Sequence, residues 1–318
     1  MAGLIARRLV AFAPTLLIVA IITFALEHIV PGGPALALVG ASGGGSRTIA
    51  LINQQLGLNK PLLAQFGTYI GHVLQGQLGQ SYINHAPVST IIGQHLGPSI
   101  ELIAGALVLS LILGVGAGIL SAVKRDTRLG QLILTASGGG LSIPDFWLAT
   151  LAAGIVGVDL KLLPATGYVP LSDGLVPNLR TMIMPVIILS IPTSAFICRH
   201  LRSSMTAALE SPYIRTSWAM GVRAPVIYFR FALRNAVTPV INFLPLVISG
   251  LIGATVVVEF VFAIPGIGSE IISAVTDRDY PTLQAIVLMV AVVVLVLNLL
   301  ADVAVGAIDP RVRSGAGT

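Results

Sequence analysis

Long uncharged runs constrain the possible folds of this chain more than any other feature of its sequence. Six stretches are apolar and almost free of charge: 9–30, 102–123, 129–158, 181–198, 236–258 and 280–301. A helix that rises about 1.5 Å per residue needs about 20 apolar residues to cross a hydrocarbon core of about 30 Å. The runs lack the regular alternation of polar and apolar residues that a β-barrel wall needs. The sequence therefore predicts an all-α membrane protein with six transmembrane helices, in a single domain over residues 1–318.

The composition supports lipid as the surrounding solvent. Charged residues make up 10% of the chain and hydrophobic residues 55%, and the mean hydropathy is +0.93. A soluble domain carries about 25% charged residues, so this chain has too few to cover a surface exposed to water. The net charge of +5 does not indicate a nucleic-acid partner, because the basic residues lie mainly in the connections between the apolar runs.

The distribution of Lys and Arg predicts the orientation in the membrane. If the N-terminus is inside, thirteen of the 18 basic residues lie on the inner side and five on the outer side. The positive-inside rule then places both termini in the cytoplasm. The start of the chain, Arg7-Arg8 followed by an apolar run, also fits a signal peptide. The run is longer than the usual 7–15 residues or so of a signal sequence, which favours a retained first span.

Two connections are too long to be simple turns. The external connection covers residues 31–98, and its segment 65–78 mixes apolar and polar residues. Short helices near the membrane surface are expected there, with a disordered loop as the alternative. The cytoplasmic connection covers residues 199–234.

The cytoplasmic connection contains the signals of a short helix. Ser211 suits the N-cap, and Pro212 suits the first helical position, where its missing N–H is not needed. Gly221 suits the residue after the helix end, which often has positive φ. Ile214 and Trp218 are four residues apart and share a face. The segment predicts a helix that displays an aromatic, apolar knob, or alternatively a helix lying flat on the lipid.

The sequence offers little to support enzyme chemistry. The dipeptide Gly-Lys never occurs, so the usual nucleotide-binding loop is missing. The five histidines are scattered without the spacing of zinc ligands. Gly114 and Gly118 are spaced four residues apart, and with the triplet 138–140 they favour close helix packing. We therefore expect no catalytic, metal-binding or cofactor-binding residues in this chain.

Asp145, Glu259 and Asp302 are acidic residues that lie in or against the apolar runs. A charge at the centre of a span costs about 2.5–3.5 kcal/mol on insertion scales, so such a residue usually faces water or the bundle interior. Asp145 directly follows Pro144, which should kink its helix, and Trp147 lies nearby. Pro144, Asp145 and Trp147 are candidates for lining a pathway; a structural polar contact between helices is the alternative for Asp145. Glu259 is expected to anchor or cap a span end.

The cytoplasmic segment resembles the coupling motif of ABC importer permeases. The residues that carry the likeness are Tyr213-Ile214-Arg215-Thr216-Ser217-Trp218-Ala219-Met220-Gly221, followed by Leu233-Arg234-Asn235-Ala236 and Pro239. The sequence departs from the general Glu-Ala-Ala form of the motif but is similar to the dipeptide/oligopeptide branch. That branch is also matched by Ser142-Ile143-Pro144-Asp145-Phe146-Trp147-Leu148, by Val257-Val258-Glu259 with Pro265-Gly266-Ile267-Gly268, and by Asp309-Pro310-Arg311.

The resemblance implies the fold of a type I ABC importer permease in the bacterial plasma membrane. It implies several partners: a second, homologous permease subunit, cytoplasmic ATPase subunits that bind ATP and Mg, and an extracytoplasmic solute-binding protein. It also implies ATPase docking at a set of residues in the cytoplasmic segment: Tyr213, Ile214, Arg215, Thr216, Trp218, Ala219 and Gly221. The expected function is to form half of the translocation pathway for peptides, with dipeptides and short oligopeptides as the expected cargo.

Other cargoes and one other class remain open at this point. Permeases of the same branch serve nickel chelates, glutathione or haem, and no residue here selects among these cargoes. A self-sufficient channel or secondary transporter is the competing class. Such a transporter usually carries ionisable relays and inverted repeats, whereas this sequence has one mid-span carboxylate and no evident repeat.

Overall fold

The computed structural model describes residues 2–29, 46–55 and 57–308, and the predicted inner-side residues Arg311 and Arg313 lie outside that part. Regular structure there is helical, apart from an isolated bridge between Gln80 and Pro87. The α-helices are α1 (Ala2–Ile29), α3 (Ser46–Gln55), α4 (Leu62–Leu74), α5 (Val88–Val123), α6 (Arg128–Ser142), α7 (Asp145–Ala152), α8 (Leu175–Leu209), α9 (Pro212–Ala219), α10 (Leu233–Phe262), α11 (Ile267–Thr276) and α12 (Tyr280–Ile308). Two π-helical segments, Ala153–Asp159 and Val226–Ala232, adjoin α7 and α10, and a short 3₁₀ turn covers Leu171–Asp173.

Five helical segments of the described chain are long and apolar enough to cross a membrane: Val10–Ile29, Val88–Val123, Leu175–Leu209, Val226–Phe262 and Tyr280–Ala301. They overlap five of the six runs. The sixth run, 129–158, is corrected by the structure, because its two halves, Arg128–Ser142 and Asp145–Asp159, are bent by 91°. Pro144 ends one helix and stands at the N-cap of the next, so it breaks the run instead of kinking it. Counted as one broken span, the pair makes six.

The connections are shorter than the hydropathy pattern indicated. α5 begins at Val88, within the predicted external segment 31–98. α3 and α4 provide the short helices expected there. α8 extends to Leu209, so much of the predicted cytoplasmic connection 199–234 is helical. Polar residues at span ends continue these helices past the apolar runs, which is why hydropathy alone underestimates their length.

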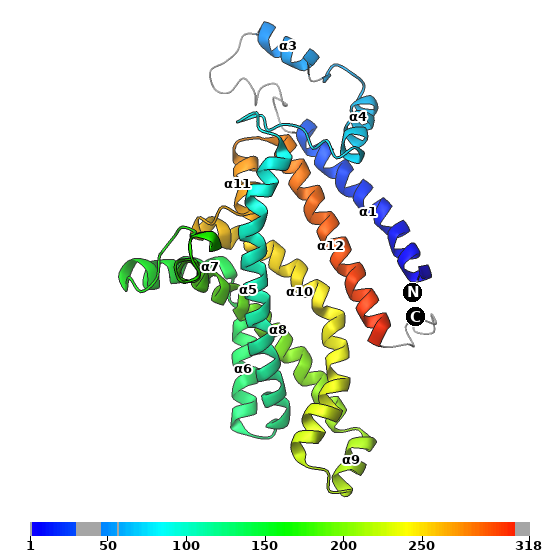
Figure 1. The fold of residues 1–318 in the computed structure, drawn as a ribbon, viewed down its shortest axis with the longest axis vertical. Helices are drawn as coiled ribbons and strands as arrows, with labels where there is room; N and C mark the ends of the chain where they lie inside the picture. Colours follow the sequence, from blue (N-terminus) through cyan, green and yellow to red (C-terminus); the bar gives the residue numbers. More distant parts are fainter. Residues whose placement is uncertain (1, 30–45, 56, 309–318) are drawn as a thin grey trace. The chain divides into compact units, whose positions relative to one another are not determined.

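The chain forms two compact units. One comprises Pro98–Gly268 with the chain from Asn298 onward, and the other comprises Ala2–Gly97 with Ser269–Leu297. In the first unit, α8 packs on α6 and α10, and Figure 1 shows α6 and α8 among the helices drawn in green. Its core joins residues of α5, α8 and α10, among them Leu102, Leu189 and Leu251. In the second unit, α1 packs against α4.

Small residues allow close helix contact in the first unit, as the glycine spacing predicted. A Cβ atom added at Gly114 would lie 2.8 Å from the Ser194 carbonyl oxygen of α8. At Gly118 it would lie 3.0 Å from Cβ of Leu201. A Cβ atom added at Gly116, between these two positions, would have nothing within 4 Å. The pair spaced four apart therefore lets the α5 backbone approach α8.

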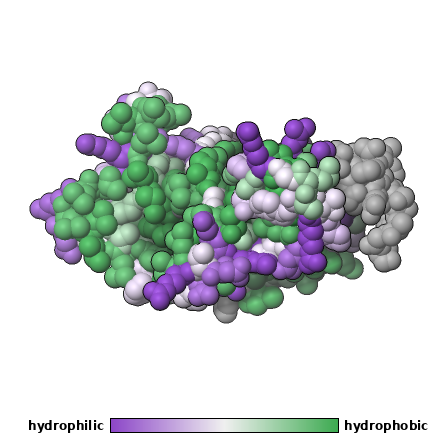
Figure 2. All heavy atoms as spheres, turned by 90° about the horizontal axis from the view of Figure 1, so that it is seen from below, coloured by the Kyte–Doolittle hydropathy of each residue, from purple (hydrophilic) through white to green (hydrophobic). Residues whose placement is uncertain are grey.

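Hydrophobic side chains also cover much of the outer surface. Leu132, Leu162 and Ile112 are 66%, 71% and 65% exposed. Figure 2 shows hydrophobic residues over much of the face that it draws, interrupted by polar groups. Exposed apolar area on this scale fits a lipid-facing surface.

Candidate functional site

The helix α9 forms at the predicted place, within the connection that the sequence predicts to be cytoplasmic. Ser211 is its N-cap residue and has extended backbone angles, and Pro212 occupies the first turn. The Ser211 hydroxyl does not cap the new helix, however. It donates a hydrogen bond back to the Ala208 carbonyl at 2.5 Å, at the end of α8. The Ser211 N–H donates to the same carbonyl at 3.2 Å, so Ser211 joins the two helices through both its backbone and its side chain.

The end of α9 is a Schellman motif built on Gly221, which has φ of +73°. The Gly221 N–H donates to the Trp218 carbonyl at 3.0 Å, and the Val222 N–H donates to the Ser217 carbonyl at 3.1 Å. These two bonds satisfy the carbonyls at the helix end. Positive φ is readily adopted by glycine and resisted by a β-branched residue. The predicted role of Gly221 in ending the helix is confirmed.

The two faces of α9 differ in what they contact. Ile214 is fully buried and belongs to a core cluster that includes Leu201, Met205 and Ile227. Ile214 therefore attaches α9 to its own chain, which corrects the prediction that it contributes to an exposed knob with Trp218. Trp218 is 44% exposed, and its ring lies edge-on to Tyr228 with centroids 6.1 Å apart.

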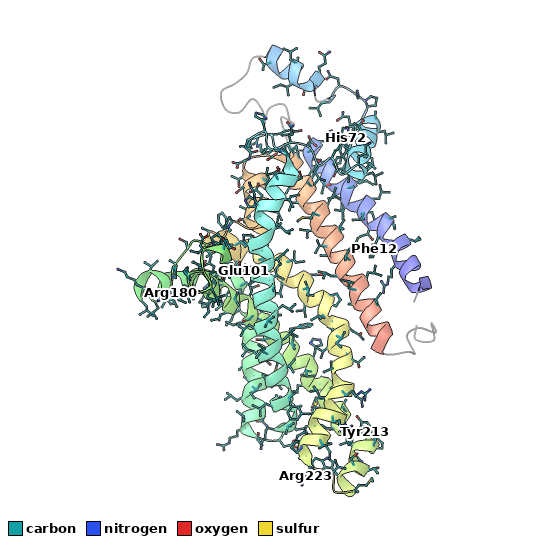
Figure 3. All side chains as sticks on the ribbon, viewed as in Figure 1. Phe12, His72, Glu101, Arg180, Tyr213 and Arg223 are labelled. Carbon is teal, nitrogen blue, oxygen red and sulfur yellow. The ribbon has the colours of Figure 1, made fainter. Side chains whose placement is uncertain are left out.

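The outward surface of α9 is apolar and aromatic with one cation. Tyr213 is 43% exposed and Met220 77% exposed, and Arg215, Thr216 and Ala219 are exposed as well. The Tyr213 hydroxyl accepts a hydrogen bond from Asn235 Nδ2 at 2.6 Å, which holds the ring in place. Figure 3 labels Tyr213 and Arg223 near the lower end of the view, where Figure 1 labels α9. We call Tyr213, Arg215, Trp218 and Met220 the α9 surface.

A second candidate site is a cavity of about 230 Å³ in the first unit. Asp145 of α7 lines it together with residues of α8 and α10: Leu189, Pro192, Thr193, Phe196, Leu246, Val247, Gly250, Leu251 and Ala254. Asp145 Oδ1 is buried, and no residue of the described chain hydrogen-bonds to it. A buried polar atom without a partner is costly. Asp145 is therefore placed to receive a donor from a group inside the cavity.

The structure separates Asp145 from the two residues predicted to accompany it. Pro144 and Trp147 are absent from the lining of this cavity. Trp147 is 50% exposed, so its indole faces outward from the unit. Pro144 acts through the backbone, because it stands at the N-cap of the helix that carries Asp145.

Glu259 is the capping residue that the sequence predicted, and its contacts extend further than expected. Its carboxylate accepts hydrogen bonds from Ser99 Oγ at 2.6 Å and from the Gly268 N–H at 2.7 Å. Ser99 Oγ in turn accepts from the Ile267 N–H at 2.7 Å. Glu259 thus fixes the first turn of α11 and joins it to α5. The side chain of Asp302 lies outside the described residues.

Glu27 was missed by the sequence reasoning. It lies within the run 9–30, and its side chain is buried, with only 9% exposed. The cost of a charge in a span, applied to Asp145, holds for this position too and would have identified Glu27.

The geometry described so far defines a class of protein, namely a membrane protein built from several long apolar helices, one of them broken. Among solved structures, inward-facing forms of the methionine ABC transporter MetNI match with a TM-score of 0.57 at 17% identity, over 70% of this chain and 98% of the other. At that identity the likeness shows the fold alone.

The sequence comparisons identify the family. Residues 114–314 match the family described as binding-protein-dependent transport system inner membrane component, and residues 1–103 match the N-terminal family of the same components. The chain belongs to this family of ABC importer permeases and is a multi-pass inner-membrane protein. This membership confirms the resemblance inferred from the coupling motif.

Relatives match over almost their whole length. A probable peptide ABC transporter permease of Sinorhizobium fredii is 34% identical, over 97% of this chain and 98% of that protein. A putative peptide transport permease of Brucella abortus is also 34% identical, over 98% and 99%. A glutathione transport system permease of Salmonella paratyphi A is 36% identical over the same shares.

Proposed function

We propose that this chain forms half of the pathway for short peptides, or for peptide-like solutes such as glutathione, in an ATP-driven importer. The names of the relatives support that cargo class. The lining of the Asp145 cavity supports it as well. The cavity is apolar, and its one buried carboxylate oxygen has no hydrogen-bond partner in the part of the chain that the structure describes. Such a site suits the amino group of a peptide, since an ammonium supplies donors and the opposite charge.

The α9 surface is the proposed docking site for an ATPase subunit. Helix-in-groove contacts concentrate their energy in a few aromatic or aliphatic anchors, often with Arg. Tyr213, Trp218 and Met220 supply such anchors, and Arg215 supplies the cation. The buried side chain of Ile214 holds α9 against the rest of its own chain. This exposed, rigidly ended helix is the observation that carries the proposal of ATP-driven transport, because a self-sufficient transporter needs no such surface.

The remaining partners are a second permease subunit and an external solute-binding protein. Segment 57–82, which contains α4, is the proposed docking region for the binding protein. Leu63 and Leu74 of α4 are 87% and 83% exposed. Both termini are proposed to lie in the cytoplasm, on the basis of the distribution of Lys and Arg.

The proposal is tested by uptake into proteoliposomes that contain this chain with its partner permease, ATPase subunits and binding protein. Dipeptide uptake should require ATP inside and should fail with a proton gradient alone. Trp218→Ala should weaken ATPase binding by roughly 10-fold or more, as expected when a central anchor is truncated. Leu132→Ala, another exposed apolar residue but on α6, serves as the matched control. Uptake driven by the gradient without ATP would assign the chain to the competing class.

The cargo is tested separately by competition. Unlabelled dipeptide, glutathione, a nickel chelate and haem are each added in excess to the uptake assay. The proposal expects dipeptide or glutathione to compete. Competition by the nickel chelate or haem alone would reject the peptide class while leaving ATP-driven transport intact.

A further inference from the structure

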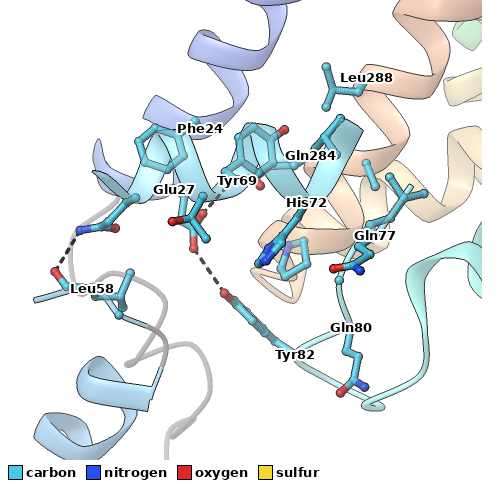
Figure 4. A pocket seen from close by; sticks show the side chains of 18 of the residues that line it. Phe24, Glu27, Leu58, Tyr69, His72, Gln77, Gln80, Tyr82, Gln284 and Leu288 are labelled. Carbon is cyan, nitrogen blue, oxygen red and sulfur yellow. Dashed lines mark hydrogen bonds between the residues drawn. The ribbon is translucent and has the colours of Figure 1, made fainter. Parts of the chain in front are cut away.

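A larger cavity lies within the second unit, and its lining shares no residue with the α9 surface or the Asp145 cavity. It measures about 530 Å³ and is bounded by the end of α1, by α4, by the turn at 57–60, by the loop 77–85 and by the start of α12. Figure 4 shows Glu27, Tyr69, His72, Tyr82 and Gln284 around it. A volume of this size is in the range that accommodates a small solute or a lipid headgroup.

Glu27 is the buried charge of this cavity. Its Oε2 accepts a hydrogen bond from Gln284 Nε2 at 2.8 Å, and its Oε1 accepts a longer one from the Tyr82 hydroxyl at 3.3 Å. A carboxylate has about four acceptor sites, so roughly half of its capacity remains. Among the described residues, no Lys or Arg forms an ion pair with Glu27. A buried charge without an ion-pair partner favours a cationic ligand.

The two donors to Glu27 are held in place by their surroundings. The Tyr82 N–H donates to Asp279 Oδ1 at 3.0 Å, and the Ser81 hydroxyl donates to Asp279 Oδ2 at 2.5 Å. Asp279 precedes α12, so it fixes the loop that carries Tyr82 to the helix that carries Gln284. Burial and the nearby Glu27 carboxylate raise the pKa of Tyr82 above its ordinary value. The phenol therefore stays protonated at neutral pH and remains a donor to Glu27.

The walls provide aromatic faces for a cation. Phe24 and Tyr69 both line the cavity and stack with ring centroids 5.9 Å apart. Ammonium groups bind favourably over such rings. The basic residues of the lining are His28, Lys60, His72 and His85. His28 is half-buried and its ring nitrogens lie against the Phe24 carbonyl and Gln65 Oε1, whereas Lys60, His72 and His85 are exposed. No group of three His, Cys, Asp or Glu in the described chain is placed to hold a metal ion.

This distribution of charge selects a ligand class. The Glu27 carboxylate in the lining is buried, whereas Lys60, His72 and His85 are exposed side chains of the same lining. A zwitterion can place its ammonium group against the Glu27 carboxylate and its anionic group near the exposed basic side chains. An anion alone would be repelled by the Glu27 carboxylate, and an apolar ligand would leave its remaining acceptor sites unused.

We propose that this cavity binds the primary ammonium group of a small zwitterion, with Glu27 as its carboxylate partner and Phe24 and Tyr69 as its walls. Two sources share this chemistry. One is a free solute such as a dipeptide, and the other is the headgroup of phosphatidylethanolamine. The inference does not depend on the proposed peptide transport, because binding is measured without turnover.

The experiment uses the assembled permease complex in nanodiscs, with binding read out at equilibrium. In discs of phosphatidylglycerol, labelled glycylglycine should bind the wild type, and N-acetylglycylglycine, which lacks the ammonium group, should not. Glu27→Gln keeps the shape and removes the charge, so it should weaken binding by roughly 10-fold or more. In mixed discs, mass spectrometry of the released complex should show phosphatidylethanolamine retained by the wild type and lost from Glu27→Gln if the lipid is the ligand.

Two further variants keep the test decisive if Glu27→Gln folds poorly. Thr68→Trp fills the cavity from an exposed position on α4, so it should also reduce binding without touching Glu27. Glu101→Gln is the matched control, since that carboxylate accepts from the Tyr168 hydroxyl at 2.8 Å in the other unit and should leave binding unchanged. Ammonium binding by either ligand that responds to both Glu27→Gln and Thr68→Trp supports the proposal. Binding by neither ligand, or binding that responds to Asp145→Asn instead, overturns it.

Discussion

The Ser99 hydroxyl donates a hydrogen bond of 2.6 Å to the Glu259 carboxylate and so joins α5 to α10 across 160 positions of the chain. Both side chains are buried. The same hydroxyl accepts from the Ile267 N–H, and the same carboxylate accepts from the Gly268 N–H. Three helices, α5, α10 and α11, therefore meet at one small polar group. A Cβ atom at Gly266 would collide with that carboxylate, which explains why a glycine fits the turn there.

Ser99→Ala should destabilise the protein by about 1–3 kcal/mol, because it leaves a buried carboxylate with one donor fewer. Thermal unfolding of the purified protein in detergent measures the loss. Thr135→Ala is the control, since Thr135 is exposed and bonds only to the carbonyl of Gln131 one turn earlier in α6. Equal melting temperatures for the two variants would contradict a structural role for the Ser99–Glu259 pair.

Gly114→Ala and Gly116→Ala should differ although they add the same methyl group to the same helix. The first inserts a carbon against the Ser194 carbonyl and Ile197 of α8, whereas the second meets nothing within 4 Å. Overpacking costs about 1–3 kcal/mol, and alanine in an open helical position is neutral or stabilising. Thermal unfolding of the two variants side by side measures the difference. A melting temperature for Gly114→Ala at or above that of Gly116→Ala would argue against close α5–α8 contact.

Gly221→Val should block transport and abolish ATPase stimulation while leaving membrane insertion intact. A Cβ at this position meets nothing within 4 Å, but φ of +73° is strained for a side chain, at a cost of about 1–2 kcal/mol. The end of α9, and with it the α9 surface, should therefore shift. Uptake and ATPase assays on the reconstituted complex provide the measurement. Gly116→Val is the control, and normal uptake by Gly221→Val would count against a coupling role for α9.

The orientation of the chain in the membrane can be tested by cysteine labelling. Cys198 is the single cysteine and is buried, so a Cys198→Ala background suits the experiment. With both termini inside, an impermeant thiol reagent added from outside should modify Asn84→Cys and spare Arg128→Cys and Arg223→Cys. All three positions are exposed. External labelling at Arg223 would reverse the topology and would place the α9 surface on the wrong side for an ATPase.

The local signals in the sequence located elements better than they located contacts. Ser211, Pro212 and Gly221 specify where α9 begins and ends, because each acts on backbone within a few residues of itself. The bond of Ser211 to Ala208 was missed, because the capping rule treats the hydroxyl as an acceptor for the N–H groups of α9, whereas here it donates to a carbonyl of α8. The Ser99–Glu259 and Glu27–Tyr82 pairs join residues far apart in the chain. No periodicity or capping rule encodes such pairs, so they become visible only in the folded chain.

The 91° bend at Pro144 is larger than the kink that the sequence predicted. Proline withholds an N–H and clashes with the preceding turn, which predicted a kink. Ile143 then takes extended backbone angles (φ −90°, ψ 125°), as residues before proline prefer. Pro144 also has extended backbone angles (φ −65°, ψ 135°). Two consecutive residues outside the helical region break the helix instead of kinking it. The depth of Asp145 in a continuous span therefore could not be deduced from the length of the run.

Asp145→Asn should change which cargo is taken up more than it changes assembly. The substitution keeps the shape of the side chain, so the packing of α7 against α8 and α10 should persist. It removes the charge from the one lining oxygen that has no hydrogen-bond partner in the described chain. A bond between an ammonium group and a carboxylate is worth more than a neutral one. The apparent KM for an amine-bearing dipeptide should therefore rise by roughly 10-fold.

The N-acetylated form of the same dipeptide provides the control for that shift. It lacks the ammonium group, so its uptake, where it occurs, should be unaffected by Asp145→Asn. Thr193→Val supplies a matched variant in the same cavity, since Thr193 already donates to the Leu189 carbonyl within α8 and carries no charge. If Asp145→Asn instead prevents assembly while residual transport keeps its preference for free amino groups, Asp145 serves a contact between helices and the cargo is recognised elsewhere in the complex.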